Sequence, residues 1–169
     1  MKKYAGLIFL LLCLCCTAAA DGQSITGTYA IKNVHTGMLL RIKDAGKANG
    51  TPLVSYNPVN WKCMTWDFRQ TENNTYQLVN LFSGKTFQPR AAAAAGVPME
   101  EQPLLAGNEQ QQYEFIAAGK NSYLIRLKNT GLYITPADDK GMVNGAIVLA
   151  PKSNSQLQLW TLYEQHPSF

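Results

Sequence analysis

The chain has 169 residues, and 46% of them are hydrophobic, which is enough apolar material for one folded domain. The formal net charge of +4 is a mild excess without a basic run along the chain, so nucleic acid is not an indicated partner. With only 2 histidines and no spacing typical of metal ligands, we expect neither a bound metal nor a cofactor.

The beginning of the chain differs from the rest. Lys2 and Lys3 precede an apolar run, residues 5–16, which leads into a threonine and three alanines. This order of basic, apolar and small residues predicts a secretory signal peptide, residues 1–20, cleaved after Ala20. The apolar run is shorter than the about 20 residues that a bilayer span needs, so we expect no membrane span.

Cleavage there predicts that residues 21–169 form a secreted domain, extracellular or, in a bacterium, periplasmic. The alternative is a lipoprotein acylated on Cys15 or Cys16, although the residues before them are not the small ones usual at such sites. Removal of the signal would leave Cys63 as the one cysteine. We expect a buried, inert thiol there, the alternatives being a nucleophile or an intermolecular bridge.

The remaining sequence is a threefold repeat with a period of 47 residues. An aromatic residue closes a three-residue motif once in every copy, in Met64-Thr65-Trp66, Gln111-Gln112-Tyr113 and Gln158-Leu159-Trp160. Each copy also opens with a tyrosine eight residues before a glycine, at Tyr29 and Gly37, Tyr76 and Gly84, and Tyr123 and Gly131. A further set of glycines drifts slightly in spacing, at Gly50, Gly96 and Gly145. The length changes therefore fall in loops, which tolerate them better than strands do.

Each copy is predicted to form about four short strands. Apolar and polar residues alternate after each opening tyrosine, and Gly, Pro and Asn turns separate the segments. Three such units cannot each bury a core, so they must share one, most simply by closing a barrel. The predicted lobes span residues 27–70, 74–117 and 121–164.

These repeats resemble the ricin-B-type β-trefoil lectins, whose three lobes each carry a Gln-x-Trp signature near the last strand. The resemblance covers essentially residues 21–169 and implies an all-β fold, a β-trefoil with a pseudo-threefold closed barrel and a hairpin cap. It implies that Trp66, Tyr113 and Trp160 fill the shared core while the signature glutamine braces its lobe. Met64 replaces that glutamine in the first lobe, where we expect it to fill space without the hydrogen bond.

The resemblance also implies where a sugar would bind. A family lobe uses an aspartate after the first conserved glycine, an aromatic residue after the second, and an asparagine or similar group just before the signature. The aspartate position holds Arg41, Gln88 and Thr135, the aromatic position holds Tyr56, Gln102 and Pro151, and the last position holds Cys63, Gln110 and Leu157. Only the first lobe keeps an aromatic ring, so we expect the carbohydrate site there.

In that site we predict Tyr56 as the stacking platform, Asn57 as its hydrogen-bonding neighbour and Arg41 in place of the acidic anchor, with Asp44 and His35 around the same groove. A guanidinium donates and never accepts, which favours carboxylated or sulfated sugars. The alternative is that Tyr56 is an ordinary half-buried strand residue and that Arg41 is solvated.

The sequence therefore predicts a secreted, non-catalytic, lectin-like protein with a weak or atypical glycan site. Its partner would be an extracellular glycan or glycoprotein, and its oligomeric state stays open. The alternative is a protein–protein interaction module on the same scaffold, without sugar binding. We expect no catalytic residues, because the acidic pairs Asp138-Asp139 and Glu100-Glu101 are predicted to lie in solvated loops.

Overall fold

The computed structural model describes residues 24–168, and the predicted signal peptide, residues 1–20, lies outside them. The strands are β1 (Gly27–Asn33), β2 (Leu39–Ile42), β3 (Leu53–Tyr56), β4 (Thr65–Glu72), β5 (Thr75–Asn80), β6 (Thr86–Pro89), β7 (Met99–Gln102), β8 (Tyr113–Ala117), β9 (Ser122–Leu127), β10 (Leu132–Pro136), β11 (Ile147–Pro151) and β12 (Leu159–Glu164). Short 3-10 turns lie between them at η1 (Lys43–Ala45), η2 (Lys62–Met64), η3 (Glu109–Gln111) and η4 (Gln156–Gln158). We call β1–β4 the first lobe, β5–β8 the second and β9–β12 the third.

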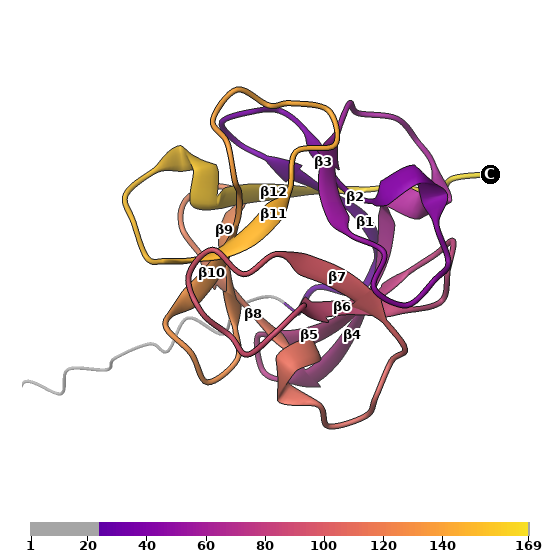
Figure 1. Cartoon of the computed structure of the whole chain (residues 1–169), viewed down its shortest axis with the longest axis horizontal. Coiled ribbons are helices and arrows are strands. Elements are labelled where there is room, and N and C mark those ends of the chain that lie inside the picture. The colour runs from indigo at the N-terminus through magenta and orange to yellow at the C-terminus, as the bar shows by residue number, and fades with distance from the viewer. Residues whose placement is uncertain (1–23, 169) are drawn as a thin grey trace, which may run out of the picture.

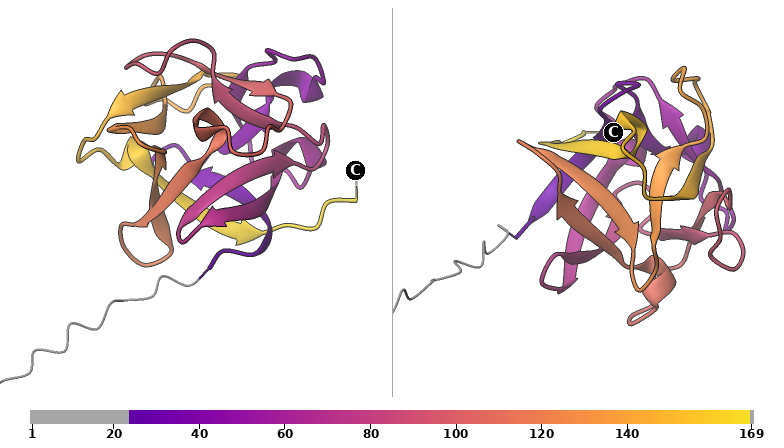
Figure 2. Two further views of the ribbon diagram at one scale, coloured as in Figure 1. Left: turned by 90° about the horizontal axis from the view of Figure 1, so that it is seen from below. Right: turned by 90° about the vertical axis from the view of Figure 1, so that its left-hand side faces the viewer.

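Two strands from each lobe close a barrel. β1, β4, β5, β8, β9 and β12 pair in that order, all antiparallel, and β12 returns to β1. The other strands form the hairpins β2–β3, β6–β7 and β10–β11, which surround the centre of the molecule in Figure 1. Figure 2 shows the barrel strands running obliquely from the hairpin end to the opposite end, where the described chain begins. The predicted all-β, pseudo-threefold β-trefoil is confirmed.

The three signature aromatic residues occupy equivalent places in the shared core. Trp66, Tyr113 and Trp160 are at most 1% exposed. Each donates a hydrogen bond to the carbonyl oxygen 26 residues earlier, on Leu40 (3.3 Å), Phe87 (3.0 Å) and Ile134 (3.1 Å). Burial raises the pKa of the Tyr113 hydroxyl well above its ordinary value, which keeps it a donor. Each lobe thus ties its barrel strand to its hairpin through a buried ring.

The hairpins bond to one another through their loops. Gly50 and Gly96 both have a φ of 83°, a conformation open to glycine, and each donates its N–H over 2.8 Å to the next hairpin, on Glu101 and Leu149. At the third junction the equivalent residue is Asn144, with a φ of 64°, whose N–H donates over 2.8 Å to the Ser55 carbonyl, while the Ser55 N–H donates over 2.8 Å to the Gly145 carbonyl. These bonds make one cap from three hairpins, which explains the glycines at Gly50 and Gly96, whereas Gly145 lies one residue after the equivalent position.

The cap corrects one sequence prediction. Glu100 and Glu101 do not lie in a solvated loop: they belong to β7 and are 9% and 0% exposed. Their strand is buried because it pairs across the cap, where the Glu101 N–H donates over 2.7 Å to the Thr51 carbonyl. Asp138-Asp139 does lie in a loop, as predicted.

The Glu101 carboxylate is only partly satisfied. Oε1 accepts a hydrogen bond from the Ser83 hydroxyl, whereas Oε2 is buried without a hydrogen-bond partner among residues 24–168. Burial raises the pKa of Glu101, and the Ser83 hydrogen bond and the charge of Lys85 offset part of that rise. An ionised Glu101 therefore costs stability in the folded protein.

This burial makes stability depend on pH. Between the ordinary pKa of 4.5 and the raised folded value, the folded protein binds more protons than the unfolded chain. The contribution of Glu101 to the free energy of unfolding therefore falls as pH rises through that window. Glu101→Gln should remove the fall, so the variant should gain on the wild type with rising pH in urea titrations. Asp139→Asn, at an exposed position, is the control, and a difference independent of pH would contradict the argument.

The barrel end opposite the hairpins is built from aromatic rings with one member missing. Phe68 and Phe115 lie opposite Leu78 and Ile125 in the barrel pairing, with ring centroids 5.0 Å apart. The equivalent third position holds Leu162. A cavity of about 240 Å³ opens beside it, lined by Ser24, Ile25, Tyr29, Asn121, Tyr123 and Leu162. Because Leu162 is smaller than the phenylalanines at the other two positions, it leaves this space between the partly exposed Tyr29 and Tyr123.

Leu162→Phe should fill this cavity and raise the free energy of unfolding by about 0.5–2 kcal/mol, the usual gain from filling a cavity. Urea denaturation of the wild type, Leu162→Phe and Leu162→Ala provides the measurement, with the alanine variant expected to be less stable than either. A phenylalanine variant less stable than the wild type would show that the position cannot accept the ring.

Candidate functional site

The first-lobe hairpin β2–β3 has two buried faces. Leu40, Ile42 and Leu53 point into the main core. The other face carries Leu39, which lies opposite Tyr56, and Arg41, which follows two residues later and is therefore a diagonal neighbour of Tyr56. This face covers a second apolar cluster that includes Cys63 and Met64. The strand register thus brings two predicted site residues together.

Arg41 stacks on Tyr56 and lies close to a tryptophan. Its guanidinium carbon is 3.9 Å from the centre of the Tyr56 ring and 5.8 Å from that of Trp61. The two ring centres are 6.1 Å apart and tilted by 36°. Arg41 is only 7% exposed, so the alternative prediction of a solvated arginine is wrong, whereas Tyr56 is half-buried. One face of Tyr56 is occupied by the guanidinium.

The other residues predicted around this groove are less closely tied to it. Asn57 and His35 are exposed, and Asp44 lies exposed in η1 with a φ of 51°. No hydrogen bond or ion pair within residues 24–168 joins the side chain of any of the three to Arg41 or Tyr56. Of the predicted site residues, Arg41 and Tyr56 are in contact. Asn57 is the neighbour of Tyr56 in the chain only.

An apolar pocket of about 260 Å³ opens beside Arg41. It is lined by Arg41, Ala45, Trp61, Lys62, Cys63 and Phe82. Phe82 comes from the β5–β6 turn of the second lobe, so the pocket lies at the junction of two lobes. The Lys47 ammonium lies 4.5 Å from the centre of the Phe82 ring. Sequence reasoning missed Trp61 and Phe82, because neither stands at a position that repeats in the other lobes.

In the other two lobes, the residue at the strand position of Arg41 is hydrogen-bonded within its own lobe. In the second lobe, Gln111 donates to Gln88 Oε1 over 2.9 Å. In the third, the Thr135 hydroxyl donates to the Leu157 carbonyl over 3.2 Å. In the first lobe the signature position holds the fully buried Met64, which offers no amide, and Arg41 Nε is buried without a hydrogen-bond partner among the described residues. Met64 therefore removes from the first lobe the amide partner that Gln111 gives this strand position in the second lobe.

The loop after β3 has a different brace. In the second lobe the loop after β7 is held by Gln111, which accepts from the Leu105 N–H and donates to the Pro103 carbonyl, each over 2.9 Å. In the first lobe Gln165, which follows β12, donates over 3.2 Å to the Val59 carbonyl and accepts over 2.8 Å from the Thr65 hydroxyl. The residue is 7% exposed. Its role has no counterpart in the repeat pattern, so the sequence did not reveal it.

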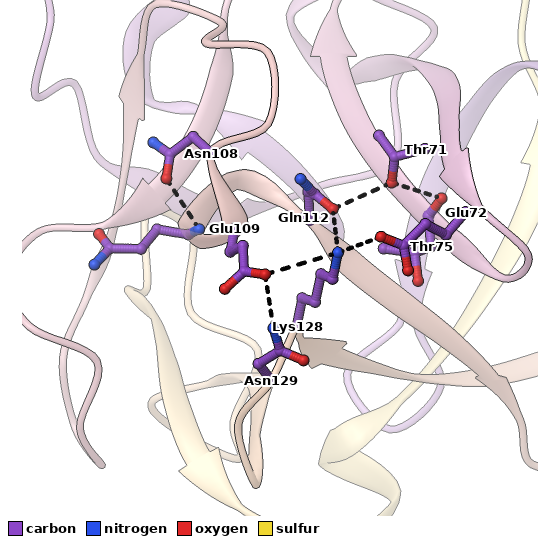
Figure 3. Close-up of polar contacts among 9 residues, drawn as sticks. Thr71, Glu72, Thr75, Asn108, Glu109, Gln112, Lys128 and Asn129 are labelled. Carbon is purple, nitrogen blue, oxygen red and sulfur yellow. Dashed lines mark hydrogen bonds and ion pairs between the residues drawn. The ribbon is translucent and has the colours of Figure 1, made fainter.

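Some charged groups elsewhere in residues 24–168 are paired. Figure 3 shows Lys128, whose ammonium lies 2.5 Å from Glu72 Oε1, 3.1 Å from Gln112 Oε1 and 3.9 Å from Glu109 Oε1. The hydrogen bond to Glu72 is the main cause of the raised pKa of Lys128. Arg41, by contrast, forms no hydrogen bond or ion pair with any residue from 24 to 168. Its stacking on Tyr56 is its main contact.

Over the described range, no three His, Cys, Asp or Glu side chains group in a way that could hold a metal ion. Between residues 24 and 168 the structure also contains no helix long and apolar enough to span a membrane.

Comparison with solved structures gives matches over most of the chain. The designed threefold-symmetric protein ThreeFoil is 19% identical, with a TM-score of 0.78 over 82% of this chain and 99% of that one. The agglutinin of Rhizoctonia solani is 18% identical, with a TM-score of 0.76 over 86% and 100%. The ricin B-like lectin of Macrolepiota procera, solved with lactose, is 18% identical, with a TM-score of 0.70 over 85% and 99%. At these identities the matches establish the fold.

Comparison with curated protein sequences gave no significant match. A protein-family model, that of the ricin-type β-trefoil lectin domain-like family, matches residues 18–100 and 62–150. The two overlapping matches cover most of the chain, and the buried aromatic residues, the closed barrel and the hairpin cap agree with that family's fold. The chain belongs to the ricin-type β-trefoil lectin domain-like family.

Proposed function

We propose that the protein is a secreted, non-catalytic carbohydrate-binding protein with an atypical glycan site in its first lobe. The observation that carries this proposal is the apolar pocket beside Arg41, which has an aromatic wall and an unpartnered cationic donor. Ligand sites of this kind combine apolar surface with a few polar groups that fix orientation. The lobe position is the one at which the family resemblance leads us to expect a sugar.

Each residue has a separate role in the proposed site. Trp61 supplies the half-exposed aromatic surface on which the apolar face of a sugar stacks. Tyr56 holds the Arg41 guanidinium in place, and Arg41 donates hydrogen bonds to the sugar. Asn57, which is exposed and follows Tyr56 in the chain, adds an amide in this proposal. The second and third lobes are weaker candidates, because Gln88 and Thr135 already have partners.

A glycan array carrying neutral and acidic sugars tests this function on the mature protein. We expect hits that disappear with Trp61→Ala and persist with Lys152→Ala, an exposed residue of the third lobe. Losing a stacking ring should weaken binding by at least about tenfold. Hits that survive Trp61→Ala would show that the sugar binds elsewhere on the protein. An array without hits, from a protein shown to be folded, would favour the protein–protein interaction module.

Secretion is tested by intact mass of the natural protein. A chain that begins near Asp21 and carries one free thiol, from Cys63, is the expected result. Thiol titration under denaturing conditions should therefore count one. A lipid on an amino-terminal cysteine would instead identify the lipoprotein and anchor the domain to a membrane.

A further inference from the structure

Arg41 is a charged donor that the folded chain leaves unsatisfied. The residue is 7% exposed, and its Nε has no hydrogen-bond partner within residues 24–168. A buried cation without a hydrogen-bonding counter-group is unfavourable, and stacking on Tyr56 offsets only part of that cost. An acceptor brought by a ligand would complete the site.

The unsatisfied donor is specific to the first lobe. Residues at the same strand position in the other lobes, Gln88 and Thr135, bond to their own lobe's 3-10 segment. In the first lobe that segment offers the Met64 and Cys63 side chains, and the Cys63 carbonyl, equivalent to that of Leu157, already accepts from Asn80 Nδ2 over 3.2 Å. No internal acceptor therefore competes with a ligand for the Arg41 guanidinium.

The surroundings of Arg41 favour an anion. Lys62 lines the same pocket, and Lys47 lies over its Phe82 wall. Within the described residues, neither lysine forms an ion pair, and Asp44, the acidic group of the adjacent 3-10 turn, pairs with none of these cations. The apolar walls lower the local dielectric constant, which strengthens a charge-assisted hydrogen bond between a guanidinium and an oxyanion.

We infer that this pocket is an anion subsite, which seats the carboxylate or sulfate group of an acidic sugar against Arg41 while the sugar ring lies on Trp61. That a sugar carries the anion rests on the proposed function. The binding of an anion beside Arg41 does not. Phe82 lines the subsite from the second lobe, and the Lys47 ammonium lies over the Phe82 ring. The charge of the ligand, more than its hydroxyl pattern, sets its affinity.

Trp61 provides a direct reporter for this subsite. Of the 3 tryptophans, Trp66 and Trp160 are at most 1% exposed, so a ligand in the pocket should change mainly the fluorescence of Trp61. Glucuronic acid and glucose, galactose 6-sulfate and galactose, and inorganic sulfate are the probes. We expect each acidic sugar to bind about ten to a hundred times more tightly than its neutral partner, the effect of one charged hydrogen bond. Added chloride salt should weaken the acidic sugars only.

Three variants assign the preference to the pocket. Arg41→Gln should abolish the difference between acidic and neutral sugars, and Arg41→Lys should retain part of it, because the charge remains while the planar donor is lost. The double variant Lys47→Gln, Lys62→Gln leaves the buried arginine in place, so it keeps the test valid if Arg41→Gln is poorly folded. It should lower the preference for acidic sugars several-fold. Lys152→Gln is the control for total charge.

The two proposals fail in different ways. Equal affinity for acidic and neutral sugars, unchanged by Arg41→Gln and by the double lysine variant, would overturn the anion subsite while array hits dependent on Trp61 keep the glycan function. Sulfate binding that requires Arg41, without a response to any of the four sugars and with an array without hits, would support the anion subsite and overturn the glycan function. No response of Trp61 to any of the five probes would overturn the subsite.

Discussion

The whole structure depends on three buried aromatic side chains, each of which has one polar atom that needs a hydrogen-bond acceptor. The indole N–H groups of Trp66 and Trp160 and the hydroxyl of Tyr113 would be costly to bury without an acceptor. Each donates to a carbonyl on its own lobe's first hairpin strand, which fixes the hairpin over the barrel. Because the three hairpins then meet, their loops can bond to one another and close the cap. The fold therefore follows from where these donors find acceptors.

The sequence was sufficient for the fold because the relevant information repeats. A ring at Trp66, Tyr113 and Trp160 and a glycine at Gly50 and Gly96 mark equivalent places, so one lobe's pattern supports the next. The prediction failed where burial comes from a neighbouring lobe. Glu100 and Glu101 stand among polar residues and prolines, which is typical of a loop, yet β7 is covered by the first-lobe loop that pairs with it. Charge alone could not reveal that cover.

The candidate site was predictable only in part, for the same reason. The strand alternation places Arg41 and Tyr56 on one face, and their contact follows from the register of a short hairpin. Trp61 and Phe82 break the repeat and come from two lobes, so no single-lobe pattern brings them together. The exchange of glutamine for Met64 was visible in the sequence. Its effect on Arg41 was not, because that effect needs the knowledge that Gln111 bonds to Gln88.

Gln165 gives the first lobe an unusual dependence on the order in which the chain is made. Its bonds to Thr65 and Val59 join residues 100 and 106 positions apart, across almost the whole domain. During synthesis the first lobe emerges before the other two, but the loop that carries Trp61 lacks its amide brace until Gln165, after the third lobe, has been added. Such distant contacts form late and slow the final folding step. The candidate site would then be the last part of the first lobe to reach its final structure. A chain that ends before Gln165 would lack the brace of the loop that carries Trp61.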